Sequence, residues 1–207
     1  MKYLTLLLPL FLLTGCALTR DNISLNYEPM ADVTQITGAE NTEVHVAVND
    51  SRQNKERVGR KINGYGMQMA SIVCENQIDE LVKEALLKEL ANRGFVLNPQ
   101  DPHVLINVEI HKMSNRFRPG FWTIKGHSET TLIITVQNPD GSPKYSKTFF
   151  GEGKAGIMLV ASGKNAKIAL EKSLEHAITQ IIEDSEFVDV LLSSVGDLKE
   201  GVLLDKK

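Results

Sequence analysis

The chain has few of the residues that build covalent sites or positively charged binding surfaces. It contains two cysteines, Cys16 and Cys74, among 207 residues, so a single chain could form at most one disulfide. Basic and acidic residues number 23 and 26, which leaves a formal net charge of −3 at pH 7. A mildly acidic chain lacks the positive field that drives nucleic-acid binding, so no nucleic-acid partner is predicted. The sequence also shows no cluster of basic residues that would draw the folded body onto an anionic lipid surface.

Long hydrophobic runs are missing too, because the apolar stretch at the N-terminus is short. It spans Leu4–Leu13, about ten residues, whereas a transmembrane helix needs roughly 20. A positive Lys2, a short apolar stretch and small residues before a cleavage point outline a secretory signal peptide, predicted at residues 1–15. Residues 13–16, with the sequence LTGC, resemble the lipobox of bacterial lipoproteins. The alternative is an ordinary secretion signal that happens to contain a cysteine.

The lipobox resemblance implies that Cys16 is an attachment point for lipid and not a free thiol. It implies a diacylglyceryl thioether on the sulfur, cleavage before Cys16 and acylation of the new amino group, for example with palmitate. Two or more acyl chains give stable anchoring, at about 0.8 kcal/mol for each buried methylene. Ala17 stands where an Asp would retain a Gram-negative lipoprotein in the inner membrane. The resemblance therefore implies a lipid anchor in the outer membrane, on its periplasmic face.

The rest of the chain divides into a tether, one domain and a tail. Residues 16–42 are largely polar and carry no period, which predicts a lipidated N-terminus followed by a tether. Residues 43–195 are expected to form a single α+β domain, which the lipobox resemblance would place in the periplasm. Residues 196–207 are expected to be loose. No second segment is long and apolar enough to span a bilayer.

Hydrophobic periodicity predicts the secondary structure of this domain. Apolar residues at 3–4 spacing make residues 76–93 the clearest helix, with Asn76 as its cap and Gly94 just beyond its end. The stripe predicted to be buried is Ile78, Leu81, Val82, Ala85, Leu86 and Leu90. A second helix begins near residue 162, and a short terminal helix covers 185–193. Alternating or apolar runs predict strands at 43–48, 95–97, 104–111, 129–137 and 144–150.

These elements predict an α+β fold. Their order is strand, helix, three or four strands and helix, with hairpins in place of a regular strand–helix–strand alternation. We therefore expect an antiparallel sheet of four to five strands with two main helices packed on one face. The other face of the sheet would stay polar and in contact with water.

Two motifs with weak catalytic signatures have simpler structural explanations. Residues 151–156, GEGKAG, match the pattern GxGxxG, but a dinucleotide fingerprint joins a first strand to a helix and is followed by an acidic residue at the next strand. Here the motif follows a hairpin strand, and Glu171 and Glu175 fall in a helix, so no cofactor is predicted. Cys74 lies in a mostly apolar stretch, which favours a small buried hydrophobe over a nucleophile or an intermolecular bridge.

The polar face of the sheet offers a metal site as an alternative. Glu109 and His111 share a strand face, as do His127 and Glu129 on a strand expected beside it. If the two strands were in register, the four side chains could hold a divalent ion and support a metal-dependent hydrolase. We favour the other interpretation, in which they are polar residues on the wet face of a sheet. The sequence carries no Ser-His-Asp or Cys-His signature of a catalytic site.

The most unusual stretch is Asn115–Trp122, where two arginines are interspersed with aromatic residues around a Pro-Gly pair. Arginine and aromatic side chains carry much of the binding energy of interfaces. The predicted partner-binding residues are Arg116, Phe117, Arg118, Phe121 and Trp122. A turn at Pro119-Gly120 would hold Phe117 and Phe121 at a tip, in contact with a partner, a glycan or lipid headgroups. The alternative is a hairpin loop whose aromatic residues fold back onto the core.

Three further segments carry a resemblance to a known family. They are VNDSR at residues 48–52, NGYGM at 63–67 and LANRGF at 90–95. Together with the lipobox and the helical region 165–192, they resemble the YajG-like lipoproteins of Gram-negative bacteria. The resemblance implies no catalytic residue. It gives Asp50 and Arg52 a structural role, in which the carboxylate caps a turn and pairs with the guanidinium.

The sequence therefore predicts a non-enzymatic outer-membrane lipoprotein whose periplasmic domain binds an envelope partner, most simply a protein. A second interpretation is a ligand-binding module for peptidoglycan fragments or lipid, which an apolar pocket between helices and sheet would favour. A third is the metal-dependent hydrolase, which converging His nitrogens and Glu oxygens would favour. The sequence does not predict an oligomeric state.

Overall fold

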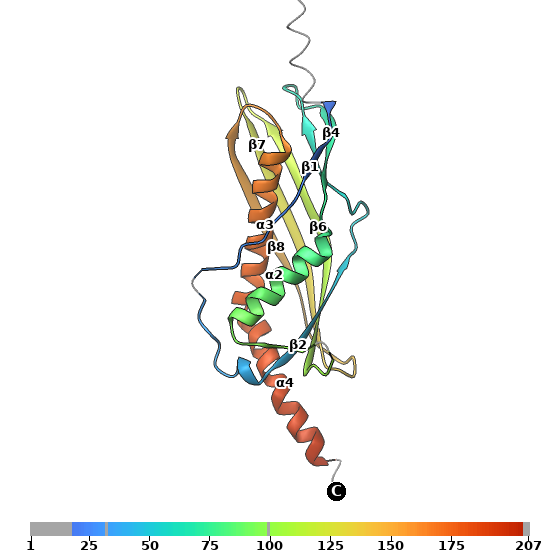
Figure 1. Cartoon of the computed structure of the whole chain (residues 1–207), viewed down its shortest axis with the longest axis vertical. Coiled ribbons are helices and arrows are strands. Elements are labelled where there is room, and N and C mark those ends of the chain that lie inside the picture. The colour runs from blue at the N-terminus through green and yellow to red at the C-terminus, as the bar shows by residue number, and fades with distance from the viewer. Residues whose placement is uncertain (1–17, 32, 99, 205–207) are drawn as a thin grey trace, which may run out of the picture.

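The structure is a computed structural model that describes residues 18–31, 33–98 and 100–204; the side chains of residues 157, 158 and 195–204 are not part of the description. The predicted signal peptide and Cys16 lie outside the described residues. Figure 1 shows an elongated molecule in which helices lie over a long twisted sheet, with the two ends of the chain at opposite ends of the long axis. No helix of the described segments is long and apolar enough to cross a membrane.

Strands dominate the described chain, and helices follow them. The strands are β1 (Asp21–Ile23), β2 (Glu43–Asp50), β3 (Arg57–Ile62), β4 (Gln68–Cys74), β5 (Val96–Leu97), β6 (Val104–Pro119), β7 (Ile124–Gln137) and β8 (Pro143–Met158). The helices are the short 3-10 helix η3 (Ala39–Asn41), α2 (Ile78–Asn92), α3 (Gly163–Glu183) and α4 (Ser185–Leu204). All six residues of the stripe predicted on α2 are buried, so that prediction is confirmed.

The ends of the helices agree with the sequence in one place and differ in two. Gly94 has a φ of +98° just after α2, which is the left-handed conformation predicted for it. Asn76 does not cap α2; its side chain instead exchanges two hydrogen bonds with the backbone of Leu25, at 3.0 and 2.9 Å. Residues 196–204, expected to be loose, continue α4 as far as Leu204.

The sheet is larger and more mixed than the sequence indicated. Eight strands form one sheet, in which β1–β4, β2–β5, β2–β6 and β3–β6 pair in parallel, while β3–β4, β6–β7 and β7–β8 pair antiparallel. The prediction of an antiparallel sheet of four to five strands is therefore wrong, although the α+β class holds. Parallel pairing of β2 with β6 requires a crossover, and α2 lies on it. The sequence missed β3 because charged residues and a glycine interrupt its alternation, and β4 because its apolar and polar residues do not alternate.

Strands β6, β7 and β8 form the long antiparallel part that the sequence did predict. Leu105 pairs with Gln137 at one end of β6–β7, and Pro119 pairs with Ile124 at the other. Gly141, in the turn between β7 and β8, has a φ of +86°, which a residue with a side chain adopts only with strain. The hairpins are longer than predicted, so they extend well beyond the body of the helices at one end.

The glycine motif at residues 151–156 lies inside β8 and faces α3. A Cβ on Gly151 would come within 2.7 Å of the Ala177 nitrogen, and a Cβ on Gly153 within 2.6 Å of the Ser173 nitrogen. Neither position has room for a side chain, so these glycines let the backbone of α3 approach the strand closely. The motif is therefore a packing feature of the helix–sheet contact.

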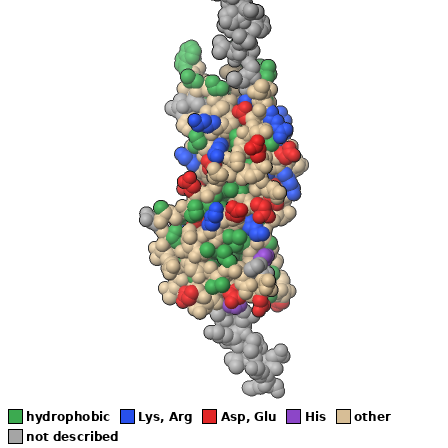
Figure 2. All heavy atoms as spheres, viewed as in Figure 1, with side chains coloured by type: hydrophobic (Ala, Val, Ile, Leu, Met, Phe, Trp, Pro, Cys, Tyr) green, Lys and Arg blue, Asp and Glu red, His purple; other side chains and the backbone are tan. Residues whose placement is uncertain are grey.

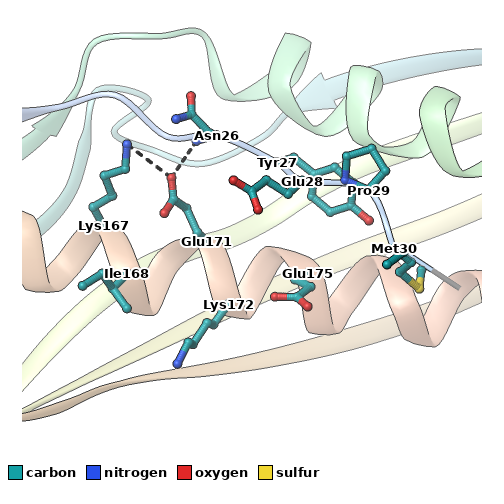
Figure 3. Close-up of a pocket in the computed structure, with 11 residues that line it drawn as sticks. Asn26, Tyr27, Glu28, Pro29, Met30, Lys167, Ile168, Glu171, Lys172 and Glu175 are labelled. Carbon is teal, nitrogen blue, oxygen red and sulfur yellow. Dashed lines mark hydrogen bonds and ion pairs between the residues drawn. The ribbon is translucent and has the colours of Figure 1, made fainter.

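Residues 24–31, which we call the strap, cross the helical layer after β1. The strap runs between α2 and α3 (Figure 3), and its side chains Leu25 and Tyr27 are buried. Because β1 pairs in parallel with β4, the chain is part of the fold from Asp21 onward. Much of the segment predicted as a tether, residues 16–42, is therefore fixed on the domain. The inward residues alternate over a run too short and too polar to stand out as a strand.

Candidate functional site

Three connections meet at the end of the molecule where the N-terminal segment enters (Figure 1). They are the β3–β4 turn (residues 63–67), the β6–β7 turn (residues 120–123) and the β8–α3 connection (residues 159–162). Strand directions bring them together, because β3 and β6 both run toward this end, and β8, antiparallel to β7, also ends there. A Cβ on Gly66 would lie 3.2 Å from the ring of Pro119, so the first two turns are neighbours.

These connections expose large apolar side chains, which we call the apolar tip. Its residues, with their exposed fractions, are Tyr65 (90%), Met67 (59%), Phe121 (91%), Trp122 (79%), Leu159 (82%) and Val160 (59%). Phe121 and Trp122 make an edge-to-face contact with ring centroids 5.2 Å apart. Figure 2 shows hydrophobic side chains projecting at this end of the molecule. Apolar side chains exposed together in this way mark an interaction surface.

The structure separates the five residues predicted to bind a partner. Arg116 and Arg118 are exposed on β6, and Phe121 and Trp122 are exposed in the turn that follows. Phe117 is buried in the core, so the expectation that it stands at a tip is wrong. It alternates with the two arginines along β6, which turns its side chain to the inner face. Binding of a partner by the four exposed residues stays a prediction.

A groove lined by basic residues, the basic groove, lies next to the apolar tip. It has a volume of about 360 Å³ and is lined by Arg118, Lys125, Gly126, His127, Lys154, Ala155 and Gly156. Arg118 lies opposite Lys125 across β6–β7, and His127 lies opposite Lys154 across β7–β8. Opposite residues have Cβ atoms about 4.5–5.5 Å apart, so register alone gathers cations from three strands. Gly153 faces α3, so the next residue, Lys154, turns to the outer face of the sheet.

The Lys and Arg side chains of the basic groove are not neutralised by neighbouring carboxylates. Within the described segments, Arg118, Lys125 and Lys154 take part in no ion pair, whereas His127, which also lines the groove, lies 3.6 Å from Glu129. The first acids met along these strands away from the tip are Glu129 and Glu152, which face each other across β7–β8. Glu129 is engaged by Lys112, and the hydrogen bond from Lys112 lowers the pKa of Glu129. The positive charge at the end of the sheet is therefore available to an anion.

This groove corrects the prediction that the chain has no basic cluster. Its cations stand far apart in the sequence and become neighbours only through strand register. The arginines of the stretch Asn115–Trp122 were the single pointer to it, and they mark one of its three strands. The net charge of the chain gave no signal, because it sums over the whole surface.

Register also decides the metal-site alternative. Glu109 pairs with Ile133, whereas Ser114 pairs with Glu129. The position of Glu109 on the sheet is therefore four residues, roughly 13 Å, away from Glu129. The described residues contain no cluster of three or more His, Cys, Asp or Glu side chains suited to a metal ion. The hydrolase interpretation loses the geometry on which it depended.

A second concave region lies between the strap and α3 (Figure 3). The cleft has a volume of about 500 Å³, and Glu28, Lys167, Glu171, Lys172 and Glu175 contribute charged side chains to its lining. The backbone N–H of Asn26 donates a 2.8 Å hydrogen bond to Glu171, and Lys167 lies 3.4 Å from the same carboxylate. Charges of both signs line it, so the cleft is not the apolar pocket that a lipid-binding module would need.

The strap is fixed to α2 by hydrogen bonds to Glu89, whose carboxylate also forms a buried ion pair with Arg93. Glu89 Oε2 and Arg93 Nη1 are 2.6 Å apart. The hydroxyl of Tyr27 donates a 2.8 Å hydrogen bond to Glu89, and the backbone N–H of Met30 donates one of 3.0 Å. Burial, together with the bond to Glu89, raises the pKa of Tyr27 far above its ordinary value, so the phenol stays protonated. Both strap groups donate to Glu89 Oε1, while Glu89 Oε2 pairs with Arg93. This arrangement indicates a structural network.

The Asp50–Arg52 pair holds the β2–β3 connection against β6. Arg52 Nε and Nη2 donate to the two oxygens of Asp50 at 2.8 and 2.7 Å. The same guanidinium donates to the carbonyls of Lys55 and Met113, at 2.7 and 3.3 Å. Burial raises the pKa of Asp50, but the hydrogen bonds from Arg52 outweigh it and the net pKa is lowered. This geometry agrees with the structural role implied by the family resemblance.

Cys74 is buried, as the sequence predicted. Its sulfur lies 3.0 Å from the Asn76 side-chain oxygen. Burial raises the pKa of the thiol, so it stays protonated at neutral pH. A protonated, buried thiol does not act as a nucleophile.

A family model described as an uncharacterized lipoprotein matches residues 29–191. The chain belongs to this lipoprotein family. The match runs from the end of the strap into α4 and agrees with the resemblance to YajG-like lipoproteins. The matched residues begin after Cys16, so acylation of Cys16 stays a prediction. A comparison with curated proteins finds no match.

Solved structures are similar to the lipoprotein at low sequence identity. Protein XCC0632 from Xanthomonas campestris, of family DUF330, is 10% identical with a TM-score of 0.54, over 87% of this chain and 99% of that one. The hypothetical protein CT253 from Chlamydia trachomatis is 10% identical with a TM-score of 0.45, over 74% and 97%. A minor lipoprotein from Acinetobacter baumannii is 8% identical with a TM-score of 0.38, over 68% and 92%. Only the first is similar enough to indicate a shared overall fold.

Proposed function

We propose that this lipoprotein is acylated at Cys16, is anchored in the outer membrane with its domain in the periplasm, and binds an envelope partner without catalysing a reaction. Membership of the lipoprotein family and the LTGC sequence at residues 13–16 support the anchor. The outer membrane is inferred from Ala17, which replaces the Asp of the inner-membrane retention signal.

The observation that carries the binding function is the exposure of Phe121 and Trp122 beside an uncompensated basic groove. Both rings are almost wholly in solvent at the end of a long hairpin. A folded protein gains stability by burying such rings, so their exposure serves contact with something outside the domain. Arg118 and Lys125 add directional, charge-assisted contacts at the same place. Cationic and aromatic side chains arranged in this way suit binding of a partner. The tip and the basic groove include no activated nucleophile.

The ligand-binding alternative rests on the cleft between the strap and α3. Its charged lining suits a polar ligand, such as a peptidoglycan fragment, better than a lipid. The strap that forms one wall is fixed by Glu89, so a ligand would have to fit between immobile walls. Exposed aromatic rings, in contrast, have no structural explanation within the domain, and this favours the tip as the binding surface.

Two experiments test the proposal in intact cells. Cys16→Ala should leave an uncleaved, unacylated precursor that is lost from the outer-membrane fraction; a variant that fractionates and migrates like the parent would refute the anchor. Crosslinking in intact envelopes, followed by capture of the protein, should recover fewer crosslinked components with Trp122→Ala or Arg118→Ala. Lys88→Ala, which removes an exposed cation from α2, is the matched control. Equal recovery from all variants would show that the tip is not the binding surface.

A further inference from the structure

We infer that the apolar tip and the basic groove lie on the anionic phospholipid surface of the membrane that holds Cys16. The tip enters the interface between headgroups and acyl chains, and the basic groove takes up headgroup phosphates. The inference rests on the proposed acylation of Cys16 and names the envelope component that this end of the molecule contacts.

The first support is the short connection between the anchor and the fold. Five residue steps separate Cys16 from Asp21, where β1 begins, and a fully extended chain covers at most about 18 Å in five steps. Asp21 is held in place, because Lys61 Nζ lies 2.7 Å from Oδ1 and the backbone N–H of Gly163 donates a 2.7 Å bond to Oδ2. The anchor therefore cannot move far from the end of the sheet.

The second support is that the maximum distance from Asp21 to Cys16 is close to the distance by which β6 extends beyond the level of Asp21. Asp21 pairs with Ile72, Ile72 with Gly59, and Gly59 with Asn115, so β1 begins level with Asn115 of β6. Strand β6 continues for four residues beyond that level, to Pro119, which is about 13 Å. An acyl anchor on Cys16 can thus extend only about 5 Å past the base of the β6–β7 turn.

The short reach excludes a folded protein between the tip and the membrane. A small domain is about 30 Å across, and the remaining distance is a fraction of that. When the acyl chains are in the bilayer, Phe121 and Trp122 must lie at or near the headgroups. A protein partner could approach this end only from the side.

The residue types of the tip suit that position. Trp and Tyr concentrate at membrane–water interfaces, because their rings are apolar and their N–H or O–H groups still reach water. Trp122, Tyr65 and Phe121 come from two separate turns, and Leu159 from a third connection. Apolar side chains exposed on three connections at one end of the molecule fit a soft surface into which each can enter.

The basic groove supplies the charge that such a surface attracts. Each Lys or Arg near an anionic bilayer adds favourable binding free energy, and the effect fades within a Debye length. Two rows of cross-strand pairs lie nearest the tip on the outer face: Arg118 with Lys125, and His127 with Lys154. Neither row contains an acid. The acids Glu129 and Glu152 come one row further from the bilayer. The charge distribution therefore orients the domain with this end toward the membrane.

The test uses the mature chain with Cys16→Ser, so that no acyl chain contributes to binding. Vesicles consist of phosphatidylethanolamine with or without phosphatidylglycerol. Trp122 is the single tryptophan of the chain, so its fluorescence reports on the tip alone. With phosphatidylglycerol present, its emission should shift to the blue and be quenched by lipids with brominated acyl chains. High salt should weaken this binding.

Matched variants separate charge, apolar contact and global effects. Lys125→Gln should lower the partition coefficient about fivefold, as expected for the loss of one cation near an anionic surface. Phe121→Ser should also weaken binding while leaving the melting temperature unchanged, because the ring is 91% exposed. Lys172→Gln removes the same charge from α3 and should bind like the parent.

Three outcomes would overturn the inference. They are an unshifted Trp122 emission with both kinds of vesicle, equal partitioning of Lys125→Gln and Lys172→Gln, and a spectral shift that needs added envelope protein. The last would assign the tip to a protein partner. Mass analysis of the N-terminal peptide of the wild-type protein tests the anchor separately. An acylated Cys16 with a tip that does not bind refutes this inference, whereas a binding tip with an unmodified Cys16 refutes the proposed function.

Discussion

Gly153→Ala should destabilise the lipoprotein severely, because the added methyl group has no space. A Cβ at this position would overlap the carbonyl oxygen of Ala169 and lie 2.6 Å from the backbone nitrogen of Ser173. The Ala169 oxygen would lie 1.9 Å from the added Cβ, and an ordinary contact needs about 3.4 Å, so α3 must move away from β8 by about 1.5 Å. The neighbours are helix backbone, which cannot turn aside as the end of a flexible side chain can.

The cost can be worked from known effects of overpacking. Inserting a methyl group into a packed core costs typically about 1–3 kcal/mol, and more where the backbone has to shift. Replacing a strand glycine without a clash gains about 0.5–1 kcal/mol, because alanine loses less conformational freedom on folding. Gly153→Ala should therefore lower the free energy of unfolding by about 2–3 kcal/mol.

Gly156→Ala is the matched control on the same strand and in the same motif. A Cβ at Gly156 would meet nothing within 4 Å, so this variant should be as stable as the parent or slightly more stable. Urea unfolding followed by far-UV circular dichroism measures both, since Trp122 is too exposed to report on the core. If the two variants unfold within about 0.5 kcal/mol of each other, the close helix–strand contact is not a determinant of stability.

Three further variants test the packing and the buried charges. Leu86→Ala should lower stability by about 2–5 kcal/mol, since Leu86 is fully buried on α2, and an unchanged melting curve would contradict this. Asp50→Asn should reduce the loss of stability in acid, because a lowered pKa contributes stability above the ordinary value of 3.8 that disappears as the pH falls through the lower folded value; identical pH profiles would refute it. Glu89→Ala should cost about 3–5 kcal/mol by leaving Arg93 buried without its partner, and an unchanged urea midpoint would argue against that network.

The sequence predicted well those elements whose pattern is local and long. The stripe on α2 has six apolar positions that all follow the helical period, and each of them is buried. The alternation in β6 and β7 is equally long, and both strands pair antiparallel over most of their length. In these elements every residue adds to the same pattern, and the alternation continues in β6 to Phe117, which is buried between two exposed arginines.

The strand order could not be read in the same way. Whether β2 pairs in parallel with β6 depends on where α2 returns the chain, and no residue within either strand encodes that. Strand β1 has three residues, too few for a period, whereas the two-residue β5 falls within the strand predicted at 95–97. The eight-stranded mixed sheet is a product of long-range pairing, and the four-to-five-stranded prediction left out β1, β3 and β4.

The candidate site shows the same division. The exposed rings Phe121 and Trp122 were marked by composition, because two aromatic residues after a Pro-Gly pair stand out in a chain with 6% aromatic residues. The basic groove was not marked, because Lys125 and Lys154 are ordinary lysines until register places them beside Arg118. Tyr65 and Leu159 gave no signal either, since their contribution depends on three connections ending at one place.

The proposed orientation of the lipoprotein on a membrane depends on one strand pairing, that of β1 with β4. Strand β1 runs parallel to β4 and so antiparallel to β3, which places its N-terminal end at the end of the sheet where the tip lies. If β1 ran in the opposite direction, the few residues before Asp21 would leave the sheet at the end far from Trp122. The anchor and the tip would then lie at opposite ends of the molecule. A long tether would have made this direction irrelevant, because the domain could turn over. Holding Asp21 through Lys61 and Gly163 removes that freedom, so an acyl anchor on Cys16 would act on the same surface as the tip.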